Sequence, residues 1–446
     1  MHHALLRPFV GAVVALACFF LAPLEAFASG GGAHGPNFAG VPIEFYLFAA
    51  TLLGVAMFHQ RTMQIAISGL VVITAFKLVF TDLHLGEHLM HEWKLATNLF
   101  GLLLGFAVLA KHFEESRLPE VMPKWLPQGF PGAFVLLLLV FVLSSFLDNI
   151  AAAMIGATLA RTVFQHRVHV GYLAAIVAAS NAGGAGSVIG DTTTTMMWID
   201  GVAAKELLPA FVGGGAAVLV CGLIASRQQH AHHPIQTKID ASVQIDGMRL
   251  LIVGMILAGA IAANIFLDFP AVGVWIAILI GAMFRKTHWH ILEHPVKGSV
   301  FLLSLVISAS MMPVESLPPA TWVTTLSLGF ISAIFDNIPL TKLALDQGGY
   351  AWDFLAYAVG FGGSMIWFGS SAGVAVATMF PQAKSVAHWL RHGWHVAVGY
   401  VIGFFVLLWV VGWDPHPPHR EEHMQPATLQ EDAEHSAPEL RSTIPP

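Results

Sequence analysis

Two similar stretches decide how this sequence folds, SSFLDNI at residues 144–150 and SAIFDNIP at residues 332–339. Each places an Asp-Asn pair inside a long apolar run, and each is followed by a second apolar run that glycines interrupt. The interruptions read SNAGGAGSVIGD at residues 180–191, and GFGGS and FGSS at residues 360–364 and 368–371. Because the same order of features occurs twice, the sequence predicts an internal repeat of two related halves.

Composition indicates the solvent in which the chain folds. Apolar residues make up 56% of it and charged residues 11%, with a mean hydropathy of +0.69. Soluble proteins carry roughly 25% charged residues, so these values predict an all-α membrane protein. The net charge of -6 argues against a nucleic-acid partner. The two cysteines, Cys18 and Cys221, both lie in apolar segments and indicate neither a disulfide framework nor a thiol metal site.

The two ends of the chain differ from the apolar body. Arg7 precedes an apolar run and Ala26-Phe27-Ala28 supplies a cleavage pattern, which predicts a signal peptide over residues 1–28. An uncleaved first transmembrane helix is the alternative. Residues 29–42 then form a periplasmic linker, and residues 413–446, rich in Pro, His and Glu, form a disordered soluble tail.

The apolar runs between these ends suit helices that cross a hydrocarbon core of about 30 Å, which takes about 20 residues each. The predicted spans are 43–58, 62–81, 95–111, 130–161, 170–200 and 208–226, then 248–267, 270–284, 298–313, 320–348, 351–381 and 395–412. They predict a first membrane repeat at 43–226, a cytoplasmic loop at 227–247 and a second repeat at 248–412. The architecture would hold about 10 transmembrane helices plus 2 hairpins.

Basic residues predict the orientation, because Lys and Arg gather in cytoplasmic loops. When the membrane crossings are counted along the chain, most basic residues fall on the cytoplasmic side. The exceptions are Lys94, Lys205, Lys342 and the two tail arginines, which fall on the outer side. That asymmetry requires 130–161 and 320–348 to be re-entrant hairpins that open to opposite sides. Two halves of opposite orientation form an inverted-topology repeat, an architecture of secondary transporters. We expect the bacterial inner membrane as the location, with the lipid bilayer as the main partner.

Three aspartates in the apolar runs are candidates for function, because an intramembrane carboxylate costs several kcal/mol unless protein, water or a counter-ion receives it. They are Asp148, Asp191 and Asp336. Glycine-rich backbone adds free carbonyl groups, and such oxygen ligands suit a hard cation such as Na⁺. A buried aspartate also accepts a proton when the cation leaves, because low dielectric disfavours its charge. The alternative is that each aspartate only caps a helix.

The predicted site combines these carboxylates with the amide, hydroxyl and glycine residues around them. Its members are Asp148, Asn149, Asn181, Gly183, Gly184, Ser187, Asp191, Thr192, Thr193, Asp336, Asn337, Gly362, Gly363, Ser364, Ser370 and Ser371. No transition-metal site is predicted, because the HLGEH stretch at residues 84–88 lacks a third zinc ligand and a cleft. No cofactor is predicted either.

Three motifs carry a resemblance to a known family: NAGG with IGDTTTTMMW at 181–184 and 189–198, DNIP at 336–339, and FLAY with GGS and GSSAGVA at 354–357, 362–364 and 369–375. On these motifs residues 40–412 resemble the ion transporter superfamily, and within it the NhaD-type sodium/proton antiporters. The resemblance implies an exchanger with a cation site between two hairpin tips and two broken helices. It further implies transported Na⁺ and H⁺ and pairing into a homodimer.

One departure from the family pattern keeps other functions open. After Asp148-Asn149 the NhaD-like pattern has threonines, whereas this sequence has Ile150 and three alanines. Neighbouring branches of the superfamily carry citrate, other dicarboxylates or arsenite, so a cation-coupled permease for a small anion is the alternative. A membrane scaffold that does not transport is a remote one. An enzyme is not predicted, because the sequence offers no convincing nucleophile and base for an intramembrane hydrolase.

Overall fold

The computed structural model describes residues 36–58, 61–81, 83–236 and 243–416. The predicted signal peptide, most of the predicted linker and nearly all of the predicted tail lie outside these residues. A short hairpin of β1 (Asn37–Phe38) and β2 (Val41–Pro42) opens the described chain. Everything after it in the described ranges is helix or connection, as expected of an all-α membrane protein.

The first half of the chain contains ten α-helices and one short 3₁₀ helix within the described residues. They are α2 (Ile43–Met57), α3 (Thr62–Phe80), α4 (Leu85–Glu115), α5 (Leu118–Val121), η2 (Met122–Trp125), α6 (Phe130–Ser144), α7 (Asn149–Val163), α8 (Val170–Ala185), α9 (Thr192–Ile199), α10 (Ala204–Leu207) and α11 (Ala210–His232). Two long members, α3 and α4, are apolar enough to cross a membrane, and so is the continuous segment Ala204–His232.

The second half contains eight α-helices and three short 3₁₀ helices within the described residues. Its elements are α12 (Gly247–Leu267), α13 (Pro270–Phe284), η3 (Trp289–Leu292), α14 (Glu293–Ser310), η4 (Val314–Ser316), α15 (Trp322–Ser332), α16 (Asn337–Gln347), α17 (Trp352–Gly362), α18 (Ser371–Met379), η5 (Pro381–Lys384) and α19 (Val386–Val410). Here α12, α19 and the segment Trp289–Ser310 have the length and apolarity of membrane spans.

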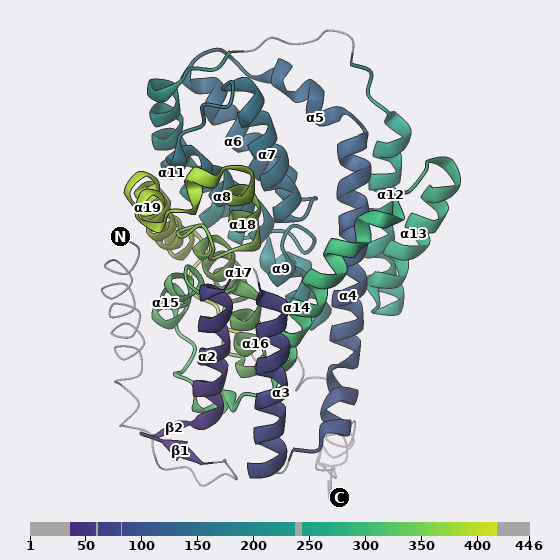
Figure 1. Ribbon diagram of the computed structural model, residues 1–446, viewed down its shortest axis with the longest axis vertical. Helices are drawn as coiled ribbons and strands as arrows, with labels where there is room; N and C mark the ends of the chain where they lie inside the picture. The colour runs from purple at the N-terminus through teal and green to yellow at the C-terminus, as the bar shows by residue number, and fades with distance from the viewer. Residues whose placement is uncertain (1–35, 59–60, 82, 237–242, 417–446) are drawn as a thin grey trace, which may run out of the picture.

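Each half contains one hairpin and one broken helix. The hairpins are α6–α7 and α15–α16, and the broken helices are α8–α9 and α17–α18. In Figure 1 the first hairpin lies in the upper part of the molecule and the second in the lower part, with α9 and α17 between them. Each hairpin packs against the broken helix of its own half, and α8 packs against α17 of the other half.

Several helices are longer than their predicted spans. The span predicted at 95–111 belongs to α4, which starts at Leu85, so the HLGEH stretch is its first turn and not a loop. Helix α11 continues past residue 226 to His232, and α19 begins at Val386, well before residue 395. The reason is physical: hydropathy marks the part of a helix inside hydrocarbon, whereas hydrogen bonding continues beyond it into polar sequence.

Candidate functional site

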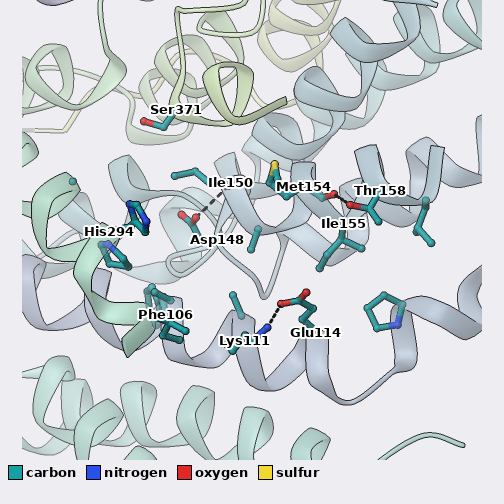
Figure 2. Close-up of a pocket in the computed structure, with 18 of the residues that line it drawn as sticks. Phe106, Lys111, Glu114, Asp148, Ile150, Met154, Ile155, Thr158, His294 and Ser371 are labelled. Carbon is teal, nitrogen blue, oxygen red and sulfur yellow. Dashed lines mark hydrogen bonds and ion pairs between the residues drawn. The ribbon is translucent and has the colours of Figure 1, made fainter. Parts of the chain in front are cut away.

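A cavity of about 1160 Å³ leads from one end of the molecule to the tip of the first hairpin. Its walls come from α4, α7 and α14, with Lys111 and Glu114 toward the outer part. Figure 2 shows Asp148 at the start of α7, across the cavity from Phe106 and the Lys111–Glu114 ion pair. Predicted site residues Thr192 and Ser371 also line this space. The cavity therefore reaches both broken helices.

All three candidate aspartates cap helices. Asp148 accepts a hydrogen bond from the Ile150 amide (3.2 Å), and Asp336 accepts one from the Ile338 amide (3.0 Å). Asp191 caps α9 in the same way. The capping alternative is thus correct as local geometry. The capping bonds engage Oδ2 of Asp148 and Oδ1 of both Asp191 and Asp336.

The glycines in the breaks allow very close backbone contacts. A Cβ atom on Gly183 would lie 2.0 Å from the Phe141 carbonyl oxygen, and one on Gly362 would lie 2.2 Å from the Gly329 carbonyl oxygen. Gly184 and Gly363 are similarly close to the backbone of Gly190 and of Gly369. Gly183 and Gly362 thus allow each hairpin to pack on its broken helix, and Gly184 and Gly363 allow each break to fold against its own helix. The break itself follows them, because α8 ends at Ala185 and α9 begins at Thr192.

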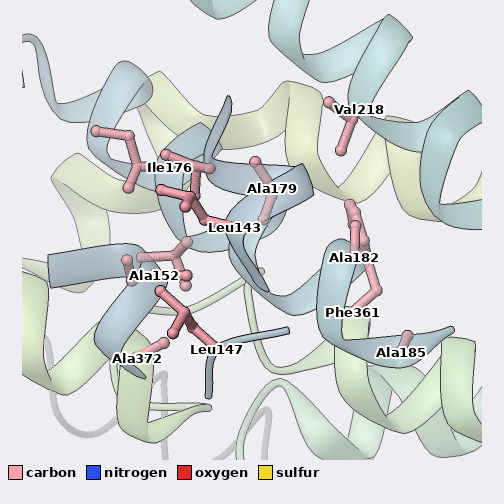
Figure 3. Packing of buried hydrophobic residues seen from close by; sticks show 14 of the residues in the cluster. Leu143, Leu147, Ala152, Ile176, Ala179, Ala182, Ala185, Val218, Phe361 and Ala372 are labelled. Atoms are coloured by element: carbon pink, nitrogen blue, oxygen red, sulfur yellow. The ribbon is translucent and has the colours of Figure 1, made fainter. Parts of the chain in front are cut away.

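Small side chains extend this close packing through the centre of the molecule. Ala152 on α7 and Ala182 on α8 are fully buried, as is Ala372 on α18. Figure 3 shows them with Phe361 of α17 in one cluster, in agreement with the packing of α7 on α18 and of α8 on α17. The tight fit brings polar residues of the two halves within hydrogen-bonding distance.

The side chain of Asn181 on α8 makes three hydrogen bonds, one within the first half and two to the second half. Its Oδ1 accepts from Asn149 Nδ2 (3.1 Å), and its Nδ2 donates to Ser364 Oγ (2.9 Å) and to Ser370 Oγ (3.2 Å). All four side chains belong to the predicted site. We call the place where Asn181 contacts Ser364 and Ser370 the first crossing of the broken helices. The side-chain amide of Asn181 occupies the space between the two helices there.

The second crossing is its counterpart in the repeat. Aligning the glycines of the two breaks places Gly360 opposite Asn181, and Ala185 and Asp191 opposite Ser364 and Ser370. A Cβ atom on Gly360 would lie 3.3 Å from Asp191 Oδ2 and 3.6 Å from Ala185 Cβ, so the same neighbours meet here. No side chain extends from Gly360, however. The second crossing therefore places a carboxylate oxygen against a bare glycine backbone.

Asp191 is the most enclosed of the three aspartates. It is 2% exposed, and its Oδ2 has no hydrogen-bond partner among the residues that the structure describes. Thr193 lies beside the carboxylate and donates its backbone amide to Asp191 Oδ1 (3.2 Å). Asp148 and Asp336 each lie near enough to repel the charge of Asp191, and no basic side chain in the described chain pairs with any of the three. Such a cluster attracts a cation or a proton.

The remaining predicted residues lie around this centre. Asp336 and Asn337 are at the tip of the second hairpin and do not line the cavity. Ser187 lies in the first break, where its carbonyl oxygen accepts a hydrogen bond from Thr194 Oγ1 (2.6 Å). Sequence reasoning missed Gly360, because a glycine gives no local signal that it lies opposite a carboxylate of the other half.

Hairpins with acidic tips, broken helices and a cavity between them define a polytopic membrane protein with a polar site at its centre. The chain belongs to the citrate transporter family, whose model matches residues 10–362. The predicted resemblance is thereby confirmed.

Individual relatives are antiporters by name. The chain is 26% identical over 282 residues to Sodium/proton antiporter 1 of Arabidopsis thaliana, covering 54% of this chain and 49% of that protein. It is 26% identical over 351 residues to the Na(+)/H(+) antiporter NhaD of Vibrio parahaemolyticus, covering 65% and 84%. The match to the Vibrio cholerae NhaD is 24% over 386 residues, covering 72% and 79%. The chain thus spans about half the length of the Arabidopsis relative and most of the two bacterial ones.

Proposed function

We propose that the protein exchanges a small cation, Na⁺ first among them, for protons across the membrane. The observation that carries the proposal is that the cavity reaches Asp148, whose charge is felt by the buried Asp191, and that no basic side chain among the described residues pairs with either carboxylate. Positive charge is what this centre lacks. The names of the bacterial relatives support the same activity.

The repeat gives the proposal a route across the membrane. We assign residues 43–226 and 248–412 to inverted-topology repeats, an assignment supported by the hairpins at opposite ends in Figure 1. The cavity then opens to the cytoplasm of a bacterial inner membrane, because Lys111, Arg117 and Lys124 lie at its end of the chain. Asp148 faces that side, Asp336 lies on the second hairpin, and Asp191 lies between them.

One site that holds either ion is sufficient for exchange. Na⁺ would take the free Oδ2 of Asp191 together with carbonyl and hydroxyl oxygens of the break, which are the ligands a hard cation prefers. A proton bound to the same carboxyl neutralises it equally well. Because the mutual repulsion of three carboxylates disfavours an empty site, the protein changes its open side with one of the two ions bound.

The test is cation-dependent proton flux in proteoliposomes, with internal pH recorded while Na⁺, Li⁺ or K⁺ is added. Asp191→Asn should reduce the flux to background. The matched control is Asp353→Asn, because Asp353 is also a buried aspartate at the start of a helix, 7% exposed, and its carboxylate accepts a hydrogen bond from the backbone amide of Phe354 (2.9 Å). Flux at the wild-type rate in Asp191→Asn would contradict the proposal.

Cation-coupled uptake of citrate is the second candidate, favoured by the description of the family model. An anion prefers helix N-termini and positive groups. Lys111 and His294 are the basic side chains among the cavity-lining residues, and Lys111 is paired with Glu114 at 2.9 Å. Labelled citrate uptake in the same proteoliposomes, without cation-driven proton flux, would replace the first candidate with this one.

A further inference from the structure

A buried cluster of charges lies on the second hairpin, away from the cavity. Lys342 of α16 is 0% exposed, and its Nζ donates to Glu92 Oε1 of α4 (3.2 Å) and to Asp346 Oδ1 one turn later (2.5 Å). Glu92 is 4% exposed. The sequence predicted Lys342 among the basic residues at the outer side, without indicating its burial. An ion pair this deep is costly to break, because each charge is left without water or a partner.

The residues of this cluster align with residues of the first hairpin that have a different environment. Aligning Asp148 with Asp336 places Met154 opposite Lys342, Ile155 opposite Leu343 and Thr158 opposite Asp346. Those three residues of α7 line the cavity. Equivalent surfaces of the two hairpins are therefore in opposite states, one open to the cavity and the other sealed.

Neighbouring contacts complete the seal. Helix α14 packs along α16, and Leu343 packs against a buried apolar cluster that includes Leu305 and Ala309 of α14. His88 Nε2 of α4 lies 2.9 Å from Ser310 Oγ at the end of α14. The helices that line the cavity, α4 and α14, thus also supply the partners that close the other end.

We propose that the Lys342–Glu92 pair is the gate that closes the path between the central site and the end of the molecule opposite the cavity. The pair joins the second hairpin to α4, and it separates when that end opens and water reaches both charges. The inference rests on the proposed transport function, because only a transporter needs the second opening. It adds to that function the residues that keep the second side shut in this state.

Two neutral substitutions in the cluster separate a gate from a simple packing contact. Glu92→Gln removes the charge that links α4 to α16 and leaves Lys342 paired with Asp346 in its own helix. Asp346→Asn removes an equal charge but keeps the interhelical Lys342–Glu92 contact. The second variant is therefore the matched control for the first, and neither leaves Lys342 without a carboxylate.

Reporter cysteines on the two hairpins measure which side is open. In a Cys18→Ser, Cys221→Ser background, Ile155→Cys reports the cavity and Leu343→Cys reports the equivalent sealed surface. A membrane-impermeant maleimide is applied to everted and to right-side-out vesicles. We expect Glu92→Gln to raise labelling of Leu343→Cys at least about fivefold and to lower labelling of Ile155→Cys, as a shift between two populations requires. Asp346→Asn should change either rate less than about twofold.

Two results would contradict the proposal that the Lys342–Glu92 pair is a gate. Unchanged labelling at both reporters in Glu92→Gln would show that the pair does not hold the second side shut. Faster labelling at both would show that it only stabilises packing. The assay needs no transported ion, so it gives an answer even if the flux experiment excludes sodium/proton exchange.

Discussion

The two crossings of the broken helices share one backbone arrangement and differ in chemistry. At the first crossing the Asn181 amide fills the space and bonds to Ser364 and Ser370. At the second crossing no side chain extends from Gly360, and Asp191 Oδ2 faces its backbone. The two positions are equivalent in the alignment of the breaks, and one is a structural joint while the other holds the charge. The difference supports one ion site at the crossings, since only the second crossing has a carboxylate oxygen without a hydrogen-bond partner among the described residues.

The largest loss of stability should come from adding a side chain at the close contact between α8 and α6. Gly183→Ala would put a methyl group 2.0 Å from the Phe141 carbonyl oxygen, where backbone cannot move aside easily. We expect a loss of at least about 3 kcal/mol in stability and little folded protein. Thermal unfolding in detergent measures it. Gly215→Ala is the control, because no atom lies within 4 Å of its added Cβ. An unchanged unfolding temperature in Gly183→Ala would show that the breaks are not tightly packed.

An intermediate effect should follow from emptying the first crossing. Asn181→Ala removes three hydrogen bonds and leaves Asn149, Ser364 and Ser370 without this partner. We expect a loss of about 2–4 kcal/mol in stability, with both transport sides affected because the joint links the halves. The unfolding midpoint and the proton flux should fall together. Full stability with altered cation selectivity would instead make Asn181 an ion ligand and remove the contrast between the crossings.

Gly360→Ala should have the smallest effect on stability. Its main effect should be on the Na⁺ dependence of the flux. Its Cβ would lie 3.3 Å from Asp191 Oδ2, a contact that a small shift of the side chain relieves. We expect stability to change by less than about 1 kcal/mol, and the Na⁺ concentration for half-maximal flux to rise about tenfold because the methyl group occupies the ion's place. A titration of flux against Na⁺ checks this. An unchanged half-maximal concentration would place the ion elsewhere.

The sequence predicted the hairpins and the breaks because few local structures tolerate an Asp-Asn pair or a glycine run inside an apolar segment. Asp148 and Asp336 accordingly begin α7 and α16. Helix ends were predicted less well, since α4 continues through polar residues at both ends that hydropathy does not register. The contacts between Asn181 and the predicted serines could not be predicted from the sequence, because they join segments nearly two hundred residues apart.

Residues whose role depends on a distant partner could not be predicted at all. Lys342 reads as an ordinary basic residue near a helix end, and the sequence does not show that Glu92 of the other half joins Asp346 as its partner. Gly360 reads as one glycine among many, and only Asp191 gives it significance. In both cases the role of the residue depends on a contact with a residue far away in the sequence. A local sequence pattern therefore does not predict it.

The length of α4 connects these observations to the lipid around the protein. Its 31 residues extend over about 46 Å, against a hydrocarbon thickness of about 30 Å. The same rod lines the cavity near Lys111 and carries Glu92 of the opposite end. Hydrophobic mismatch acts on such a helix by changing its tilt. Tilting α4 would move both ends at once in opposite directions, so acyl-chain length should change the packing at the Lys111 end and at the Glu92 end together.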